Sequence, residues 1–211
     1  MLLQRALRIL ATGLCAGLLL ACTQSKITES HVDKALLERD LDGVLVVAIT
    51  KTQAAREDFE AAFAKAIGKR GARAVASYEL VAARKPSAEA ILKAAADAQL
   101  DTVLVTRYIG EDREEVYHPG RIYYGIAPVY GAGYYGGFDG YYGHAYEVAY
   151  EQPVWSANVT HFLVSDLYIA ATQEHMWQAV SETVESSGDT RTRNDAISAL
   201  IGDLKAQGLL P

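Results

Sequence analysis

The residues of this chain that could do chemistry are few and widely spaced. No two of its five histidines stand at i, i+4 or in a zinc-ligand spacing; they are His31, His118, His144, His161 and His175. No serine lies in a G-x-S-x-G nucleophile turn, and the cysteines are Cys15 and Cys22. We therefore expect no catalytic residue, no metal site and no cofactor, and a protein that is not an enzyme.

One glycine pattern imitates a nucleotide site. Residues 131–136 read GAGYYG, which is the G-x-G-x-x-G spacing of dinucleotide-binding loops. That motif works only between a strand and a helix whose N-terminus receives the pyrophosphate. The flanking residues predict neither element, so the match follows from the local glycine content.

Cys22 is the residue whose surroundings indicate a specific chemistry. It follows a basic segment with Arg5 and Arg8 and a nearly unbroken apolar stretch, 9–20, that is too short to span a bilayer. The sequence Leu19-Leu20-Ala21-Cys22 resembles the lipobox of bacterial lipoproteins. The resemblance implies cleavage between Ala21 and Cys22, with diacylglycerol on the Cys22 thiol and a third acyl chain, such as palmitate, on its amine. The alternative is an ordinary secretory signal peptide or an uncleaved anchor.

The resemblance also implies a location. Thr23 stands where an inner-membrane retention signal would have aspartate, so we expect attachment to the periplasmic face of the outer membrane, with the membrane as a partner through the lipid. Loss of the signal peptide, residues 1–21, takes the formal charge from −6 to −8. A chain this acidic is not expected to bind nucleic acid. Residues 22–41 are polar and predict a lipidated tether with a mean reach of about 25 Å.

Residues 42–211 predict a single α/β domain. Residues 44–49 form an apolar, β-branched run typical of a strand buried on both faces. A helix is expected after Thr50 and Gln53, which have capping-box spacing. We expect a second strand at 72–80 and a second helix that begins at Pro86-Ser87. A third strand is expected at 101–106. Helices between such strands imply right-handed crossovers and parallel pairing.

The C-terminal third has a different pattern. Residues 158–170 and 175–184 alternate and predict a hairpin on which His161 and His175 would face one another. A helix through Ile197 and Leu204 is expected to end near Gly208. The result is a mixed sheet of about five strands in the order β-α-β-α-β-β-β-α, with helices packed on it and Trp177 in or beside the core. The acidic run at 111–115 is expected to be a solvated loop.

This element order behind a lipobox resembles small α/β envelope proteins of Gram-negative bacteria. The resemblance is to the N-terminal domain of TolB, the activator lipoprotein LpoB and the curli secretion lipoprotein CsgG. It also rests on two local phrases, REDFE at 56–60 and VASY at 75–78. Neither phrase is a site motif, so the resemblance implies no functional residue in this chain.

Residues 117–150 form a long insertion that is rich in tyrosine and glycine. It holds ten of the 13 tyrosines and eight of the 17 glycines, with neither helical nor strand periodicity. Tyrosine rings suit contact with sugars, proteins or lipid interfaces, so the candidate contact residues are Tyr123, Tyr124, Tyr130, Tyr134, Tyr135, Tyr141 and Tyr142. The alternative is low-complexity filler. If the insertion is a loop outside the core, deletion of residues 121–143 should leave folding nearly intact.

These features predict a non-enzymatic, lipid-anchored lipoprotein that binds or scaffolds another envelope component, such as an envelope protein or peptidoglycan glycan. One alternative is a subunit of an oligomeric assembly or secretion pore, similar to CsgG. A third hypothesis is an enzyme that acts on peptidoglycan. It would need a pocket with convergent acids or histidines, which the sequence alone does not show.

Overall fold

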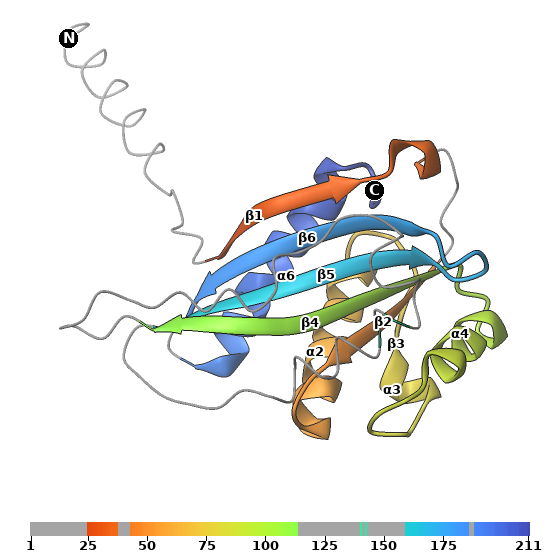
Figure 1. Ribbon diagram of the computed structural model, residues 1–211, viewed down its shortest axis with the longest axis horizontal. Helices are drawn as coiled ribbons and strands as arrows, with labels where there is room; N and C mark the ends of the chain where they lie inside the picture. The colour runs from red at the N-terminus through yellow and green to blue at the C-terminus, as the bar shows by residue number, and fades with distance from the viewer. Residues whose placement is uncertain (1–24, 38–42, 114–139, 141, 143–158, 186–187) are drawn as a thin grey trace, which may run out of the picture.

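The computed structural model describes residues 25–37, 43–113, 140, 142, 159–185 and 188–211. The fold is of the mixed α/β class that the sequence predicts. One six-stranded sheet has the strand order β1-β6-β5-β4-β2-β3, with helices packed on both of its faces (Figure 1). The strands are β1 (Ser25–Val32), β2 (Val44–Ile49), β3 (Ala74–Ala76), β4 (Thr102–Arg113), β5 (Val159–Ile169) and β6 (His175–Val184).

The parallel half of the sheet is built from the first predicted strands. β2 lies between β3 and β4 and pairs with both in parallel register, and all six of its residues are buried. Helices α2 (Gln53–Gly68), α3 (Ser77–Leu80) and α4 (Ala88–Asp97) make the connections. Ser87 caps α4 by accepting a hydrogen bond from Ala90 N, as the Pro86-Ser87 pair predicts.

The antiparallel half contains the predicted hairpin. β5 pairs antiparallel with both β4 and β6, and β6 pairs antiparallel with β1. The turn between β5 and β6 places Gln173 at φ 59°. Helix α6 (Asp189–Ala206) follows, and Gly208 after it adopts φ +79°, a conformation that favours glycine at a helix end.

The sheet separates two hydrophobic cores. On one face α2 and α6 pack on Val46, Leu104 and Leu167, with Trp177 fully buried among them, as expected. On the other face α4 packs on Leu45, Val47, Val103 and Val105. Alternate residues of β2 and β4 therefore enter different cores, which explains why β2 is apolar throughout.

The tether expected over residues 22–41 is replaced in part by structure. Residues Ser25–Val32 form strand β1 on the outer edge of the sheet, and a 3-10 helix (η2, Lys34–Leu36) follows with Asp33 as its N-cap. Most β1 side chains are exposed, because an edge strand pairs on one side and gains its stability from backbone bonds to β6. The polar composition of residues 25–32 therefore does not predict a strand.

Three boundaries differ from the prediction. The expected strand at 72–80 is only Ala74–Ala76, because residues Ser77–Leu80 turn into α3. The N-cap of α2 is Thr52, whose side chain accepts from Ala55 N, and not Thr50. Strand β4 continues to Arg113, so the first part of the acidic run is strand and not loop.

Candidate functional site

A pocket of about 500 Å³ lies at one end of the antiparallel half of the sheet. Its sides are the first two turns of α2 and of α6, and its floor is the sheet face between these helices. The lining residues from α2 are Ala55, Asp58 and Phe59, and those from α6 are Asp189, Thr192, Arg193 and Ala196. The volume is within the range of small-ligand sites, about 300–1,000 Å³.

The floor of the pocket comes from β4, β5 and β6, and a cross-strand row of paired residues connects it to β1. Ser25 of β1 pairs with Thr183, Thr183 with His161, and His161 with Glu111. This row crosses the sheet from its β1 edge, and the Ser25 hydroxyl donates a hydrogen bond to Thr183 Oγ1 at 2.7 Å. Neighbouring strands are about 4.8 Å apart, so His161 lies about 10 Å from Ser25 across the sheet.

His161 stands between two carboxylates in this pocket. Its Nδ1 lies 3.7 Å from Glu111 Oε2, and its Nε2 lies 3.8 Å from Glu185 Oε2. The Tyr108 hydroxyl donates to the same Glu111 oxygen at 2.8 Å, and the Tyr108 and His161 ring centroids are 6.1 Å apart. The His161 contacts exceed hydrogen-bond length, so the imidazole is not held tightly by either acid.

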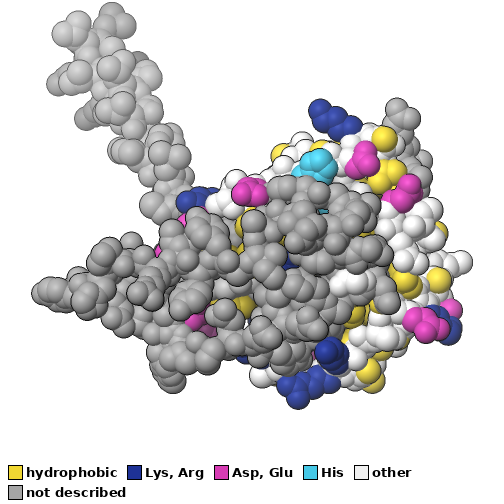
Figure 2. Space-filling view, in the orientation of Figure 1, with side chains coloured by type: hydrophobic (Ala, Val, Ile, Leu, Met, Phe, Trp, Pro, Cys, Tyr) yellow, Lys and Arg dark blue, Asp and Glu magenta, His cyan; other side chains and the backbone are white. Residues whose placement is uncertain are grey.

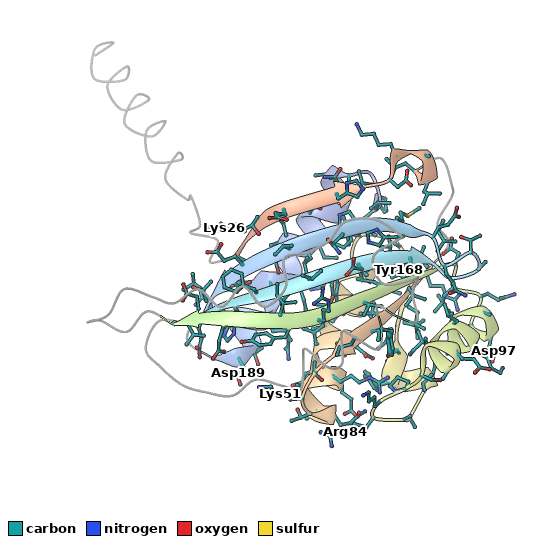
Figure 3. The ribbon with its side chains drawn as sticks, viewed as in Figure 1. Lys26, Lys51, Arg84, Asp97, Tyr168 and Asp189 are labelled. Carbon is teal, nitrogen blue, oxygen red and sulfur yellow. The ribbon has the colours of Figure 1, made fainter. Side chains whose placement is uncertain are left out.

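The other charged residues of the pocket lie on the helices. Arg193 Nη1 of α6 is 3.5 Å from Asp58 Oδ2 of α2, and this contact bridges the two walls. Asp189, in the first turn of α6, has no ion-pair partner in the described part of the chain. Figure 3 places Asp189 and Lys26 at the same end of the sheet, and Asp97 of α4 at the opposite end.

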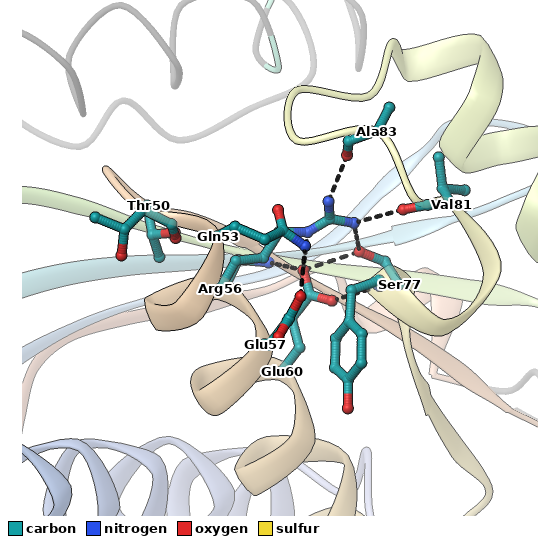
Figure 4. Close-up of polar contacts among 11 residues, drawn as sticks. Thr50, Gln53, Arg56, Glu57, Glu60, Ser77, Val81 and Ala83 are labelled. Carbon is teal, nitrogen blue, oxygen red and sulfur yellow. Dashed lines mark hydrogen bonds and ion pairs between the residues drawn. The ribbon is translucent and has the colours of Figure 1, made fainter.

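A second polar cluster lies beneath α2 and is completely buried (Figure 4). Arg56 Nε donates to Glu60 Oε1 at 2.9 Å, and Ser77 bonds to both side chains. Glu60 also accepts from the backbone N–H groups of Ala48 and Tyr78. The remaining Arg56 donors reach the carbonyls of Val81 and Ala83. Because its polar atoms are all hydrogen-bonded, this cluster is a structural network and not an available site.

The two sequence phrases that carried the family resemblance meet in this network. Arg56 and Glu60 belong to the first phrase, and Ser77 and Tyr78 belong to the second. Burial, and then the charges of Glu79 and Glu57, raise the pKa of the Tyr78 phenol above its ordinary value of 10.0. The phrases therefore encode how α2 docks on β3 and α3.

A third polar group lies on the face of the sheet away from α2 and α6. The Asp166 carboxylate of β5 is buried, and its Oδ1 lies 2.9 Å from His175 Nε2 and accepts from Gln178 Nε2. His175 pairs with Tyr168 in the hairpin register, whereas His161 pairs with Thr183. The expectation that the two histidines face one another is wrong, because they lie at opposite ends of the hairpin.

The predicted site residues fall mainly outside the described part of the chain. This holds for Ala21 and Cys22 and for six candidate contact tyrosines, which are Tyr123, Tyr124, Tyr130, Tyr134, Tyr135 and Tyr141. Tyr142 is described, and it is 3% exposed within the α4-side core. Its selection as a surface contact is therefore wrong, since an isolated tyrosine looks alike in sequence whether its ring is buried or exposed. Deletion of residues 121–143 would remove this core side chain.

Three further observations concern the surface, the helices and possible metal ligands. Figure 2 shows acidic and basic side chains interspersed over the described part of the visible face. Within the described ranges, no helix is long and apolar enough to cross a membrane, and no group of three or more His, Cys, Asp or Glu residues is arranged to hold a metal ion.

Comparison with known proteins finds similarity in overall structure alone. No protein-family model matches the chain, and no curated protein matches it. A PelC dodecamer from Paraburkholderia phytofirmans (space group P6) matches with a TM-score of 0.48 and 13% identity, covering 85% of this chain and 96% of that chain. A point variant of the same PelC (space group C2) matches with a TM-score of 0.44 and 13% identity, covering 83% and 94%. At these values neither match assigns a function or an assembly to this chain.

Proposed function

We propose that this chain is a lipid-anchored protein of the cell envelope that acts by binding another envelope component close to the membrane. The lipobox resemblance supports the anchor, and the short distance between that anchor and the fold supports a position close to the membrane. Cys22 stands three residues before Ser25, the first residue of β1. Three extended residues span about 10 Å at most, compared with the 25 Å expected of a long tether.

Such a short connection would give the domain a defined orientation. Ser25 lies in the same cross-strand row as Thr183 and His161, two residues of the pocket. An acylated Cys22 would therefore hold the pocket end of the sheet near the bilayer and α4 away from it. We propose the periplasmic face of the outer membrane as the location, on the basis of the lipobox resemblance and Thr23.

Acylation is tested by metabolic labelling with palmitate and by membrane fractionation. The wild-type chain should take up label and sediment with outer membranes, and Cys22→Ser should do neither. Absence of label, or a Cys22→Ser chain that fractionates like the wild type, would contradict the proposal.

Orientation is tested with single spin labels and a paramagnetic lipid headgroup. Lys26, whose side chain is 67% exposed, and Asp97, which is 66% exposed at the other end, are matched positions for labelling. In the acylated chain the label at Lys26→Cys should relax faster than the label at Asp97→Cys. Equal relaxation would contradict the orientation even if the lipid is present.

An enzyme is the second candidate, because the pocket does bring a histidine and acids together. The acids lie 3.7 and 3.8 Å from His161, and the described lining of the pocket contains no serine or cysteine that the imidazole could activate as a nucleophile. We therefore prefer a binding role. Peptidoglycan turnover by the wild type that is lost in His161→Gln would favour the enzyme instead.

The oligomeric alternative is tested by the mass of the detergent-purified chain in light scattering. The outer strand β1 carries a bulge between Ile27 and Glu29, and its charged side chains include Lys26. Such features oppose edge-to-edge pairing of sheets. We expect a small species, and discrete high-order rings would favour the assembly subunit.

A further inference from the structure

The pocket between α2 and α6 combines apolar walls with an acidic surround. Phe59, Ala55, Leu163 and Ala196 supply apolar surface to its lining. The Phe59 ring packs edge-on against Phe63, with centroids 5.8 Å apart, so it is held in place by the core. Tyr108 adds a second aromatic ring from the floor. Such walls can accept an aliphatic stem, and the two rings can interact with a cation at its end.

The charges around the pocket are unequal. Three carboxylates line it, those of Asp58, Glu185 and Asp189, against the single guanidinium of Arg193. Asp58 is already in contact with that guanidinium at 3.5 Å. Glu111 lies behind His161 and adds a further negative charge. A ligand that enters this pocket therefore meets a net negative field from the described residues, with Glu185 and Asp189 as the acids not paired to arginine or lysine.

We propose that the pocket binds a basic side chain, lysine or arginine, that projects from a partner polypeptide. This inference rests on the binding role proposed above and assigns the chemistry of the partner. The volume of about 500 Å³ fits one long side chain with part of its backbone and is too small for a folded element. The aliphatic stem would lie against Phe59 and Leu163, and its cationic end would approach Glu185 and Asp189.

The test uses the full chain in nanodiscs of phosphatidylglycerol, a lipid whose headgroup carries no cationic group. The probes are the N-acetyl amides of lysine, arginine, norleucine and glutamate, followed by amide chemical shifts of the protein. The lysine and arginine probes should bind with a Kd of about 1 mM, as expected for ligands of this size. Shifts should centre on residues of the first turns of α2 and α6. The norleucine probe should bind at least about fivefold more weakly.

The matched variants separate a local contact from the general charge of the protein. Glu185→Gln should weaken the lysine probe about three- to tenfold, because it removes one acid of the pocket lining whose side chain is 44% exposed. The control is Glu89→Gln. It removes the same charge from an exposed position on α4, which packs on the opposite face of the sheet. It should leave the affinity unchanged.

Several outcomes would overturn the inference. These are no binding of the lysine probe, equal binding of the norleucine probe, tighter binding of the glutamate probe, or equal losses in the two variants. Displacement of the lysine probe by nanodiscs of phosphatidylethanolamine would also overturn it, in favour of a lipid headgroup. Acylation and orientation are measured in separate experiments. Failure of the probe to bind would therefore not contradict the lipid anchor, and absence of acylation would not contradict a measured affinity for the lysine probe.

Discussion

Two charged clusters, one between α2 and α3 and one on the sheet at the pocket, differ in almost every physical respect. The Arg56–Glu60 pair is 2% and 0% exposed, has contacts of 2.6–3.4 Å, and includes Ser77 and four backbone groups. The cluster at the pocket, where His161 lies between Glu111 and Glu185, has contacts of 3.7 and 3.8 Å and stays partly open to solvent. All polar atoms of the first cluster are hydrogen-bonded within the protein, whereas the charged groups of the second can still bind a ligand.

This difference explains why the more conspicuous ion pair is the less promising site. A buried pair must satisfy its polar atoms within the protein, since desolvation of an incomplete pair costs more than its attraction returns. The loosely arranged pocket cluster keeps its solvation and adds little to stability. The following variants test that contrast, from the largest expected effect to the smallest.

Replacement Glu60→Gln should destabilise the fold by about 3–5 kcal/mol, because it leaves the Arg56 charge buried without its counter-ion. Urea unfolding monitored by circular dichroism measures the change. Glu57→Gln, which alters an exposed carboxylate one turn earlier on α2, is the control and should have little effect. A loss below about 1 kcal/mol for Glu60→Gln would show that the network is not needed for stability.

Replacement Ser77→Ala should cost about 1–3 kcal/mol, because it removes a hydroxyl that bonds to both Arg56 and Glu60 in a buried position. The same unfolding measurement applies. Ser198→Ala, on the exposed side of α6, should change stability by less than about 0.5 kcal/mol. Equal effects of the two serine variants would argue against a special role for the network.

Replacement Thr52→Ala should cost about 1 kcal/mol, because it removes the N-cap of α2, the helix that carries Arg56 and Glu60. Thr50→Ala is the matched control. Thr50 Oγ1 donates to the Thr52 carbonyl at an exposed position, so its loss should cost less than about 0.5 kcal/mol. Thermal unfolding distinguishes the two, and a larger effect at Thr50 would restore the capping box first expected from the sequence.

Replacements His161→Gln and Glu185→Gln should each change stability by less than about 0.5 kcal/mol, because their contacts are long and partly exposed. The change is measured by unfolding in parallel with probe binding, in which Glu185→Gln is expected to have a clear effect. A stability loss comparable to that of Glu60→Gln would mean that the pocket cluster is structural, and the contrast between the two clusters would fail.

The fold was largely readable from local patterns. The apolar run of β2, the alternation of β5 and β6, and the helical spacing of Ile197 and Leu204 each specify an element within a few residues of sequence. β1 was missed because an edge strand needs little apolar surface. β3 was predicted too long because Ser77 and Tyr78 turn away from the sheet to reach Glu60, a contact 17 or more residues distant.

The pocket could not have been predicted in the same way. Its residues come from α2, β4, β5, β6 and α6, and the contact between Asp58 and Arg193 joins segments more than 100 residues apart. The alternating pattern of residues 158–170 does predict that His161 lies on a strand. Its neighbours Glu111 and Glu185 depend on the register of two different strand pairs and on where β6 ends.

The sequence by itself determined the lipobox-like segment, the α/β class and the principal strands and helices, because short-range periodicity and composition encode these directly. Only the tertiary structure decided that the chain enters the sheet three residues after Cys22 and that Tyr142 is buried. It also decided that one charged cluster is buried and fully hydrogen-bonded while the other is partly exposed. These properties depend on packing between distant segments, and local side-chain patterns carry no information about which distant groups will satisfy a given charge.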